Sequence, residues 1–316
     1  MKLYEHKDFE QAVLRAEEHF RARGLKAAFI EKDYYVTEAL RLVASAAEGK
    51  IIFKGGTSLS KGWNLIDRFS EDVDIFLNPA DLGNRAIDRE LKRIRDVVAG
   101  HSGLTLQQGE GQTVGGFGRS DRYSYTQRFG GAGAIANRVL LEIGTASGNQ
   151  PVEIKEIRSY LAEFLEANRL SLGAEDEAGF VMPLLHFRRT FVEKMFAIHD
   201  KVDLLKRDGR PIGSYARHYY DLVRLAATPE VLAMLNSAEY AEIKADYDRI
   251  SKEHFAKNYH PPEQLSFAHS DALFPSGDLS VTLGKEYDAQ CRVLCYTAYP
   301  KWEEVQNTFA ALRDRL

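Results

Sequence analysis

The chain has 316 residues, of which 42 are Lys or Arg and 46 are Asp or Glu, so its formal net charge is −4. A slightly acidic protein has no global electrostatic attraction to nucleic acid, and any nucleic-acid substrate must be held by a local basic patch. Two cysteines are too few for a disulfide framework, and no run of eighteen apolar residues predicts a membrane-spanning helix. The charged N-terminal sequence is not typical of a signal peptide, so we expect a cytoplasmic protein with no membrane partner.

Two helices are predicted before the first strand. Apolar residues recur at helical spacing from Asp8 to Arg23, where Gly24 ends the pattern, and again from Ala27 to Ala47. Within the second helix, Glu31, Lys32 and Asp33 could reach a site formed by the segment that follows. The alternative, which we favour, is a solvated charge cluster near the start of the helix.

The segment from Ile51 to Leu77 carries the strongest functional signal. Its second half predicts a strand in which Asp72 and Asp74 are two residues apart, so both carboxylates project from the same face. Two adjacent carboxylates repel each other unless a cation lies between them. Oxygen ligands of this kind suit Mg²⁺, which usually takes one or two protein carboxylates together with substrate phosphates.

The first half of the same segment predicts a phosphate-binding turn. A short apolar strand ends in a Gly-Gly turn, where the absence of side chains allows a polyphosphate to approach the backbone N–H groups. We expect Thr57 and Ser58 to cap a helix beginning near Leu59 and to direct its N-terminus at the same anion. The nucleotide-binding residues predicted here are Lys54, Gly55, Gly56, Thr57 and Ser58.

Each half of this pattern has a structural interpretation when it stands alone. A Gly-Gly-Thr-Ser sequence is most often a turn with a helix cap, and a D-x-D strand is most often a solvated face. The combination is more specific, and it resembles the nucleotidyltransferase superfamily. More narrowly, KGGTSLSK followed by RFSEDVDIF resembles the AbiEii/AbiGii toxins of bacterial toxin–antitoxin and abortive-infection systems.

The next predicted elements complete a small sheet. A helix is expected from Ile87 to Val98, followed by a glycine-rich region from Gly100 to Gly133 that contains a strand from Tyr123 to Arg128. The GGFGR sequence in this region could form a second phosphate loop, but no helix signal follows it, so we discount it. A further strand is predicted at Val152–Ile157 and a helix at Ser159–Asn168.

One acid interrupts the apolar strand predicted from Arg138 to Gly144. Burying Glu142 alone would be costly, so it either faces solvent or joins Asp72 and Asp74 as a third carboxylate. The resemblance favours the second interpretation, because the superfamily places its third acid on a later strand.

From Pro183 onward we expect helices. Phe187, Phe191, Met195, Ile198, Val202 and Leu205 form an apolar stripe, and Lys194 lies near its edge. A helix from Tyr215 to Ala226 places Asp221 on one face with two arginines, which is common in salt-bridged surface helices. The resemblance implies more for two of these residues. FVEKMFAIHDK and SYARHYYDLVRL match the third and fourth motifs of the toxin group, which makes Lys194 and Asp221 active-site residues.

These elements predict an α/β (α+β) protein in two domains. Residues 1–170 are expected to form a nucleotidyltransferase-like domain with a mixed sheet and helices, and residues 171–316 a helical domain that completes the active site. The boundary is expected between Asn168 and Pro183, where the sequence is polar. By the resemblance, the active site lies in a cleft between the two domains.

The resemblance implies transfer of a nucleoside monophosphate from an NTP to a hydroxyl. Asp72 and Asp74 would hold Mg²⁺, with Glu142 assisting at a second metal, and Lys194 would neutralise the leaving pyrophosphate. The implied partners are the 3′ end of tRNA as acceptor and a separately encoded antitoxin. If RNA is bound, the expected local cations are Arg188, Arg189, Arg217 and Arg224.

Two alternatives from other classes remain open. One is a nucleotidyltransferase that modifies a small molecule or a protein hydroxyl. The other is a non-catalytic nucleotide-binding protein, against which the presence of both acids and both glycines argues.

Overall fold

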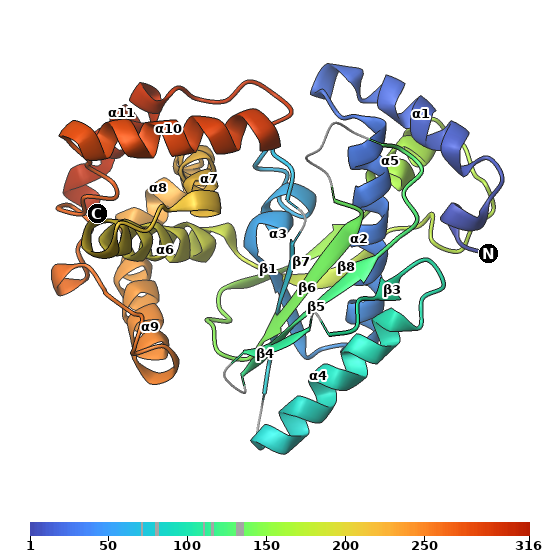
Figure 1. Ribbon diagram of the computed structural model, residues 1–316, viewed down its shortest axis with the longest axis horizontal. Coiled ribbons are helices and arrows are strands. Elements are labelled where there is room, and N and C mark those ends of the chain that lie inside the picture. Colours follow the sequence, from blue (N-terminus) through green and yellow to red (C-terminus); the bar gives the residue numbers. More distant parts are fainter. Residues whose placement is uncertain (71, 80–81, 110, 115–116, 131–135) are drawn as a thin grey trace. The chain divides into compact units, whose positions relative to one another are not determined.

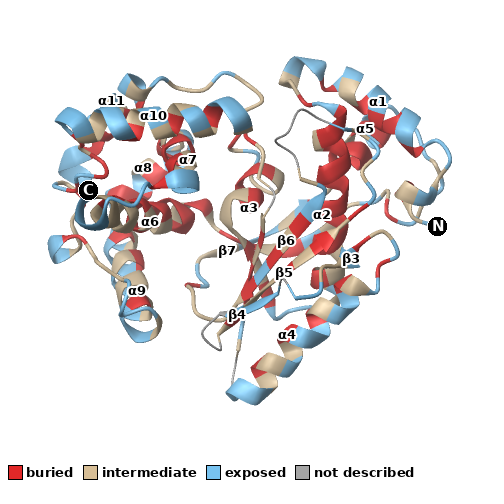
Figure 2. Cartoon of the chain, in the orientation of Figure 1, coloured by how far each residue is buried: buried red, intermediate tan, exposed pale blue. Residues whose placement is uncertain are grey.

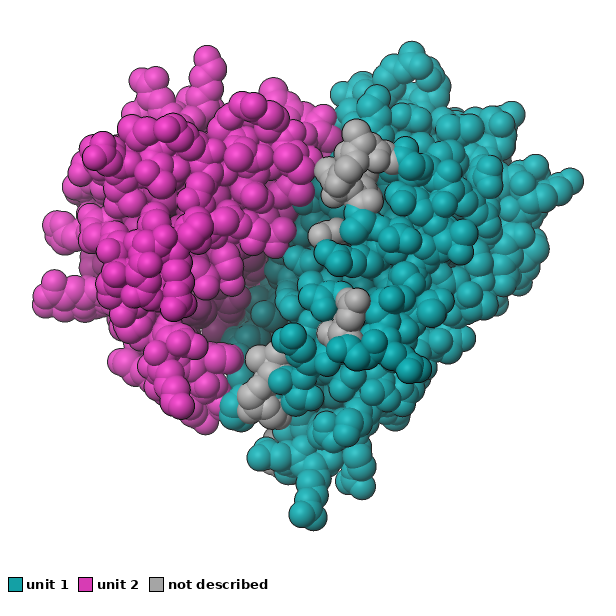
Figure 3. Space-filling view, in the orientation of Figure 1, with its two compact units in different colours: residues 1–64, 69–185 teal, residues 65–68, 186–316 magenta. Residues whose placement is uncertain are grey.

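The computed structural model describes residues 1–316 except 71, 80–81, 110, 115–116 and 131–135. It divides into two compact units, coloured separately in Figure 3. The first unit contains residues 1–64 and 69–185, and the second contains residues 65–68 and 186–316. The division near residue 185 lies C-terminal to the boundary expected at residue 170, and the short segment 65–68 belongs to the second unit although first-unit residues flank it.

Among the described residues, a mixed eight-stranded sheet forms the centre of the first unit, as Figure 1 shows by its arrows. Its strands are β1 (Ile51–Lys54), β2 (Asp72–Leu77), β3 (Thr105–Leu106), β4 (Gln112–Val114), β5 (Gly118–Ser124), β6 (Arg138–Gly144), β7 (Val152–Ile157) and β8 (Phe180–Leu185). The order across the sheet is β3-β5-β6-β2-β1-β8-β7, and β4 pairs with β5. The β2–β6 and β1–β8 pairs are parallel, whereas the other pairs are antiparallel.

Alternation along the strands gives the sheet one apolar face. Val73 and Ile75 are buried, and their partners on β6, Leu141 and Ile143, are buried with them. Helix α2 (Ala27–Ala46) packs on β6, and α4 (Asn84–Ala99) packs on β5, where the Tyr123 hydroxyl donates to a carbonyl of α4. Because successive side chains point to opposite faces, Asp72, Asp74 and Glu142 project from the other face.

The described part of the first unit has three more α-helices: α1 (Phe9–His19), α3 (Gly55–Lys61) and α5 (Tyr160–Ala167). Helices α1, α2 and α5 pack against one another, and α3 packs against β1 and β2. Gly24 has a φ of 71°, which ends the first helical region as the glycine there predicts. The helices expected at 8–23, 27–47, 87–98 and 159–168 are therefore present, with ends that differ by a few residues.

One strand prediction was wrong, and one strand was not predicted. The strand expected from Tyr123 to Arg128 lies earlier, at β5, because residues 118–124 pair along the whole length of β6. Residues 180–185 were assigned to a polar boundary and a helix start, yet they form β8, which pairs with β1 and β7. The GGFGR sequence falls partly on residues 115–116, which lie outside the described residues.

The acidic and basic residues of α2 are not solvated, contrary to expectation. Glu31, Lys32 and Asp33 are all buried, as Figure 2 shows for most of α2. Glu31 accepts hydrogen bonds from the backbone N–H groups of Arg128 and Phe129, and Lys32 donates to a carbonyl at residue 136. Asp33 forms an ion pair of 2.5 Å with Lys61 at the end of α3. These charges therefore fix loops and α3 to the core of the first unit.

The second unit is helical. It contains α6 (Phe187–Asp208), α7 (Arg217–Ala226), α8 (Pro229–Leu235), α9 (Ala238–His254), α10 (Gly277–Leu294) and α11 (Trp302–Leu312). The predicted apolar stripe of α6 is buried except at Leu205, which is half-buried. Helix α6 packs on α7, α8 and α9, and α7 also packs on α10 and α11. Within the described parts of both units, we find no helix with the length and apolar character needed to cross a bilayer.

Candidate active site

Strand register aligns a row of polar side chains across the first unit's sheet. Lys54 of β1 pairs with Asp74 of β2, Asp74 pairs with Glu142 of β6, and Glu142 pairs with Ser120 of β5. Directly paired residues lie on the same face with their Cβ atoms about 5 Å apart. The row therefore brings one cation, two carboxylates and one hydroxyl together on the face opposite α2 and α4. We call these four residues the polar row.

Asp72 lies on the same face as Asp74, one strand repeat away. Its carbonyl oxygen accepts a hydrogen bond from the Thr57 hydroxyl of α3. Asp72 and Asp74 are both partly exposed, whereas Val73 between them is fully buried. The D-x-D sequence thus anchors the strand in the core and leaves two carboxylates at the surface, beside the Gly-Gly turn.

The first glycine of the turn lies directly against Asp74. Gly55 has a φ of +76°, and a Cβ atom at this position would lie 1.9 Å from Asp74 Oδ2. Only glycine both adopts this conformation readily and leaves room for the carboxylate. The turn therefore packs directly on the D-x-D strand, and its partly exposed backbone lies close to a carboxylate.

The hydroxyls of Thr57 and Ser58 are used inside the fold. Both residues are buried; Thr57 donates to Asp72 and Ser58 donates to the carbonyl of Gly55 at 2.9 Å. Helix α3 begins at Gly55, so the expectation that these side chains cap a helix beginning near Leu59 was wrong. Both hydroxyls stabilise the turn, and Gly56 follows Gly55 in the first turn of α3.

Glu142 is electrostatically part of this site. Loss of hydration raises the pKa of its carboxyl, and the negative charges of Asp74 and Asp72 raise it further, while Lys54 opposes them. A group that senses both aspartates lies close to them. Part of the Glu142 residue remains exposed to solvent, while its carboxyl is partly dehydrated beside Asp72 and Asp74.

The other two predicted residues belong to a buried charge cluster in the second unit. Lys194 of α6 and Asp221 of α7 form an ion pair, with Nζ 2.8 Å from Oδ2. The guanidinium of Arg68 donates two hydrogen bonds to the same carboxylate, from Nε to Oδ1 at 2.6 Å and from Nη2 to Oδ2 at 2.7 Å. His218 Nδ1 lies 3.1 Å from Lys194 Nζ. We call Arg68, Lys194, His218 and Asp221 the charge cluster.

The charge states of the cluster follow from burial and from each partner. Burial alone would raise the pKa of Asp221, but Arg68 and Lys194 hold it well below its usual range. Burial and the nearby Lys194 ammonium lower the pKa of His218 to about 3, so the imidazole is neutral near pH 7. The cluster thus holds two cations and one anion. The interpretation of Asp221 as part of a surface salt-bridge helix was wrong, since its side chain is fully buried.

Comparison with known families identifies the family of this chain. The family model described as "Nucleotidyl transferase AbiEii toxin, Type IV TA system" matches residues 39–297, which include every predicted site residue. The chain belongs to this family. It is therefore a nucleotidyltransferase toxin of a type IV toxin–antitoxin system.

Comparisons with curated proteins and with solved structures do not by themselves establish the family. No curated protein matches the chain. Among solved structures, the chain is similar to MenT4, a nucleotidyltransferase toxin from Mycobacterium tuberculosis H37Rv, with 14% sequence identity and a TM-score of 0.49 over 95% of this chain and 99% of MenT4. The family assignment rests on the family model.

The donor set of this AbiEii-family chain suits Mg²⁺ bound partly through substrate. Asp72 and Asp74 offer two carboxylates on one strand face, and Mg²⁺ commonly takes one or two carboxylates and completes its shell with water and phosphate oxygens. Among the described residues, no three His, Cys, Asp or Glu side chains converge as a metal site by themselves. Two aspartates therefore fit the metal, whereas Glu142 as a further ligand stays a prediction.

Adding one methyl group at Gly55 should disrupt the site. Gly55→Ala forces a contact with the Asp74 carboxylate and imposes a left-handed backbone on alanine, which costs about 1–2 kcal/mol by itself. Gly49→Ala is the matched control, because Gly49 has a φ of +71° with no atom within 4 Å of the added Cβ. We expect both variants to lose this backbone increment in chemical denaturation, but only Gly55→Ala to lose transfer activity. Equal activity in the two variants would contradict the packing of Asp74 against the turn.

Glu142→Gln should stabilise the metal-free protein in a pH-dependent way. Because the fold raises the pKa of Glu142 above its ordinary value of 4.5, ionisation weakens the folded state, and wild-type stability is lost as pH rises through the folded pKa. Glutamine removes this loss. The melting temperature of the variant should therefore exceed that of the wild type by more at about pH 8 than at about pH 4.5. A pH-independent difference would show that the fold does not raise the pKa of Glu142.

Sequence reasoning missed Arg68 and overvalued another arginine. Arg68 stands in the quoted RFSEDVDIF sequence, but its partner Asp221 is 153 residues away, so no local pattern reveals the pair. Arg189, expected to contact RNA, is buried and paired with Glu193 and Asp246. That expectation was wrong, because a buried and doubly paired guanidinium is not available to phosphate.

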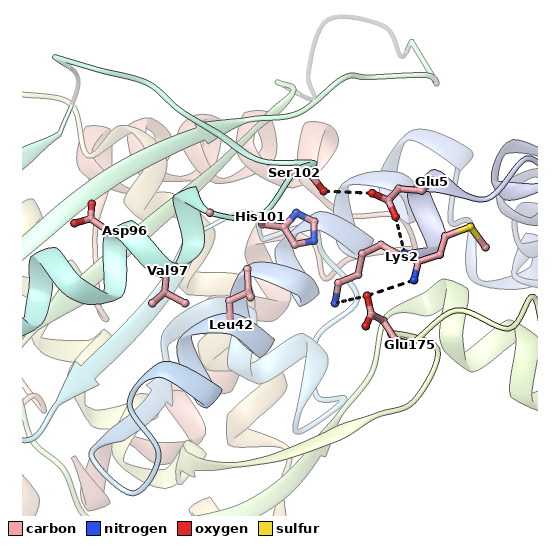
Figure 4. A pocket seen from close by; sticks show the side chains of 10 residues that line it. Lys2, Glu5, Leu42, Asp96, Val97, His101, Ser102 and Glu175 are labelled. Atoms are coloured by element: carbon pink, nitrogen blue, oxygen red, sulfur yellow. Dashed lines mark hydrogen bonds and ion pairs between the residues drawn. The ribbon is translucent and has the colours of Figure 1, made fainter.

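A pocket of about 390 Å³ in the first unit is separate from the polar row. Figure 4 shows Lys2, Glu5, His101 and Glu175 among its lining residues, with Lys2 and Glu175 in an ion pair of 3.7 Å. Three carboxylates, those of Glu5, Asp96 and Glu175, line it with one lysine, Lys2, and none of the predicted site residues does. We therefore do not assign the nucleotide to this pocket.

Proposed function

We propose that this toxin transfers a nucleoside monophosphate from an NTP to a hydroxyl of RNA, at the 3′ end of tRNA, and that the transfer requires Mg²⁺. The observation that carries the proposal is the polar row, in which Lys54, Asp74 and Glu142 are aligned across three strands with Gly55 against Asp74. Backbone N–H groups, a cation and paired carboxylates are the parts that phosphoryl-type transfer needs.

The reaction has a simple balance of bonds. The acceptor oxygen forms a bond to the α-phosphorus of the NTP, the bond between that phosphorus and the pyrophosphate oxygen breaks, and the hydroxyl proton leaves. Catalysis of such a step is largely positioning and charge stabilisation, because little covalent chemistry involves the protein.

Asp72 and Asp74 would hold the metal, with Glu142 assisting. When bound there, Mg²⁺ supplies neutralisation of phosphate charge and a lower pKa for the attacking hydroxyl. The raised pKa of Glu142 makes its carboxylate a better proton acceptor than an ordinary glutamate, so it could take the proton of the attacking hydroxyl. Without a cation, the acids would repel both one another and the substrate phosphates.

The Gly-Gly turn would bind the triphosphate, and the charge cluster would stabilise the leaving pyrophosphate. Lys54 and the backbone at Gly55 and Gly56 would hold the triphosphate, since this stretch combines a cation with accessible N–H groups. Lys194 would neutralise charge on the leaving pyrophosphate, and Asp221, which accepts a hydrogen bond from Lys194, would orient it. The choice of acceptor comes from the resemblance to the toxin group, and the type IV assignment implies an antitoxin partner.

The experiment that tests the acceptor is a labelling screen. The protein is incubated with each of the four α-labelled NTPs, in separate reactions with purified tRNA, total protein and a small-molecule extract. We expect label in tRNA that is removed by a 3′ exonuclease and is absent without Mg²⁺. Label only in protein or in small molecules would overturn the RNA acceptor. Label in tRNA that survives in an Asp74→Asn variant would overturn the assignment of the site.

A further inference from the structure

Four residues between the two motifs of the first unit are bound into the second. The Leu65–Arg68 segment joins α3 to β2, yet it is part of the second unit. Asp67 donates its backbone N–H to the Tyr220 hydroxyl at 2.9 Å and accepts at its carbonyl from the N–H of Tyr296 at 3.2 Å. Arg68 forms an isolated antiparallel bridge with Cys295. The backbone of this segment is therefore fixed on both sides.

This fixed backbone presents one side chain to Asp221. The exposed fraction of the Arg68 side chain is 1% and that of Asp221 is 0%, and the two are joined by two hydrogen bonds. Bidentate pairing sets the orientation of the carboxylate as well as its charge. Oδ2 of Asp221 also lies 2.8 Å from Lys194 Nζ, so the same oxygen contacts both cations. The orientation of the Lys194 ammonium group therefore depends on Arg68.

Arg68 also determines the net charge of the charge cluster. Lys194 and Asp221 alone would form a neutral pair, and His218 is neutral. Arg68 adds one positive charge, so the buried group carries a net positive charge. Arg217 of α7 adds to the positive potential at Lys194, while the Cys295 thiol also faces Arg68 and Asp221. A buried excess of positive charge favours a bound anion.

We propose that Arg68 is a positioning residue for nucleotidyl transfer, which fixes Asp221 and leaves Lys194 with a net positive charge toward a polyphosphate. This inference rests on the proposed role of Lys194 and adds the residue that sets its orientation and charge. Arg68 acts through Asp221 and does not itself contact the nucleotide.

The pH dependence of activity separates this role from a structural one. Burial lowers the pKa of Lys194, and Arg68 and Arg217 lower it further, against Asp221. If Lys194 must be protonated, the rate falls as pH rises through this lowered value. Replacing Arg68 by the uncharged Met removes one lowering effect and leaves Lys194 paired with Asp221, so no buried charge is orphaned. The alkaline limb of the profile should then move to higher pH by about half a unit or more.

The experiment compares three variants by pH profile, kcat, KM and pyrophosphate inhibition. For Arg68→Met we expect the shifted limb, kcat/KM lowered by about 10–100-fold, and weaker inhibition by pyrophosphate. Arg68→Lys keeps the positive charge but loses the two-bond contact with Asp221. For this variant we expect a lower kcat, with the alkaline limb of the pH profile at its wild-type position. Arg224→Met is the control for the pH profile alone, because Arg224 holds Leu65 and Asp67 of the same segment. Its KM and kcat are not compared, since Arg224 is also one of the arginines expected to contact RNA. Its limb should stay at the wild-type position.

Several outcomes would overturn the inference. One is a folded Arg68→Met variant whose alkaline limb and pyrophosphate inhibition are both those of the wild type. Another is an alkaline limb that moves in Arg224→Met as far as in Arg68→Met. If Arg68→Met does not fold, a wild-type kcat in Arg68→Lys decides against it. Full activity in Lys194→Met would instead remove the proposed function on which the inference rests.

Discussion

Replacing Asp74 by asparagine should lower nucleotidyl transfer by roughly 10³-fold or more while the metal-free protein stays folded. Asp74 stands at the centre of the polar row, between Lys54 and Glu142, and its carboxylate lies against Gly55. Asparagine keeps the shape that fits this contact but lacks the negative charge that a divalent cation requires. The loss should therefore appear in turnover and not in folding.

Stability provides a check that is independent of activity. Asp74 raises the pKa of Glu142 through repulsion, so removing its charge relieves part of that repulsion. The melting temperature of the metal-free Asp74→Asn variant should equal or exceed that of the wild type, and added Mg²⁺ should stabilise it less. Glu153→Gln, which removes an exposed acid of β7 outside the polar row, is the matched control and should retain transfer. Near-normal turnover in Asp74→Asn would remove the metal site from this face.

Replacing Lys194 by methionine should lower turnover by about 10²-fold or more, the scale observed when one preorganised electrostatic group is lost. Methionine fills a similar volume in a site where the lysine side chain is only 7% exposed. Asp221 keeps its two bonds to Arg68, so the variant leaves no carboxylate unpaired. A large fall in activity with a small fall in stability is therefore expected from kinetics and chemical denaturation.

Lys201 offers a control on the same helix. It lies seven residues beyond Lys194 on α6, is half-buried, and packs over the ring of Tyr215 at 4.6 Å. Lys201→Met removes one positive charge from α6 without touching the charge cluster, and its turnover should stay within a few-fold of the wild type. If the two variants lose activity equally, the effect belongs to the overall charge of the helix and not to Lys194.

The parts that sequence predicts well are those set by local spacing. A period of two places Asp72 and Asp74 on one strand face, and the same alternation within β6 puts Glu142 on the face opposite Leu141 and Ile143. The helical stripe of α6 predicts its buried side in the same way. What spacing alone does not provide is register between strands, which aligns Lys54, Asp74 and Glu142 in one row.

The parts that sequence misses depend on distant partners. β8 was overlooked because residues 180–185 lie between a polar stretch, taken as the domain boundary, and the helical pattern expected from Pro183 onward, yet this strand pairs with β1 and β7 on its two sides. Local spacing alone suggests a solvated group at Glu31, Lys32 and Asp33. In the folded chain, Glu31 accepts a hydrogen bond from a backbone N–H 97 residues away, and Lys32 donates one to a carbonyl 104 residues away. Arg68 is hidden for the same reason, since only the folded chain brings it to Asp221.

The position of the transferred phosphorus tests the central claim most directly. Wild-type protein is incubated with tRNA, Mg²⁺ and the active NTP labelled either at the α- or at the γ-phosphate, and the label is followed in RNA and in released pyrophosphate. The polar row as a nucleotidyl-transfer site predicts α-label in RNA, γ-label in pyrophosphate, and neither product with Asp74→Asn. Recovery of γ-label in RNA, or unchanged transfer of α-label by Asp74→Asn, would contradict it.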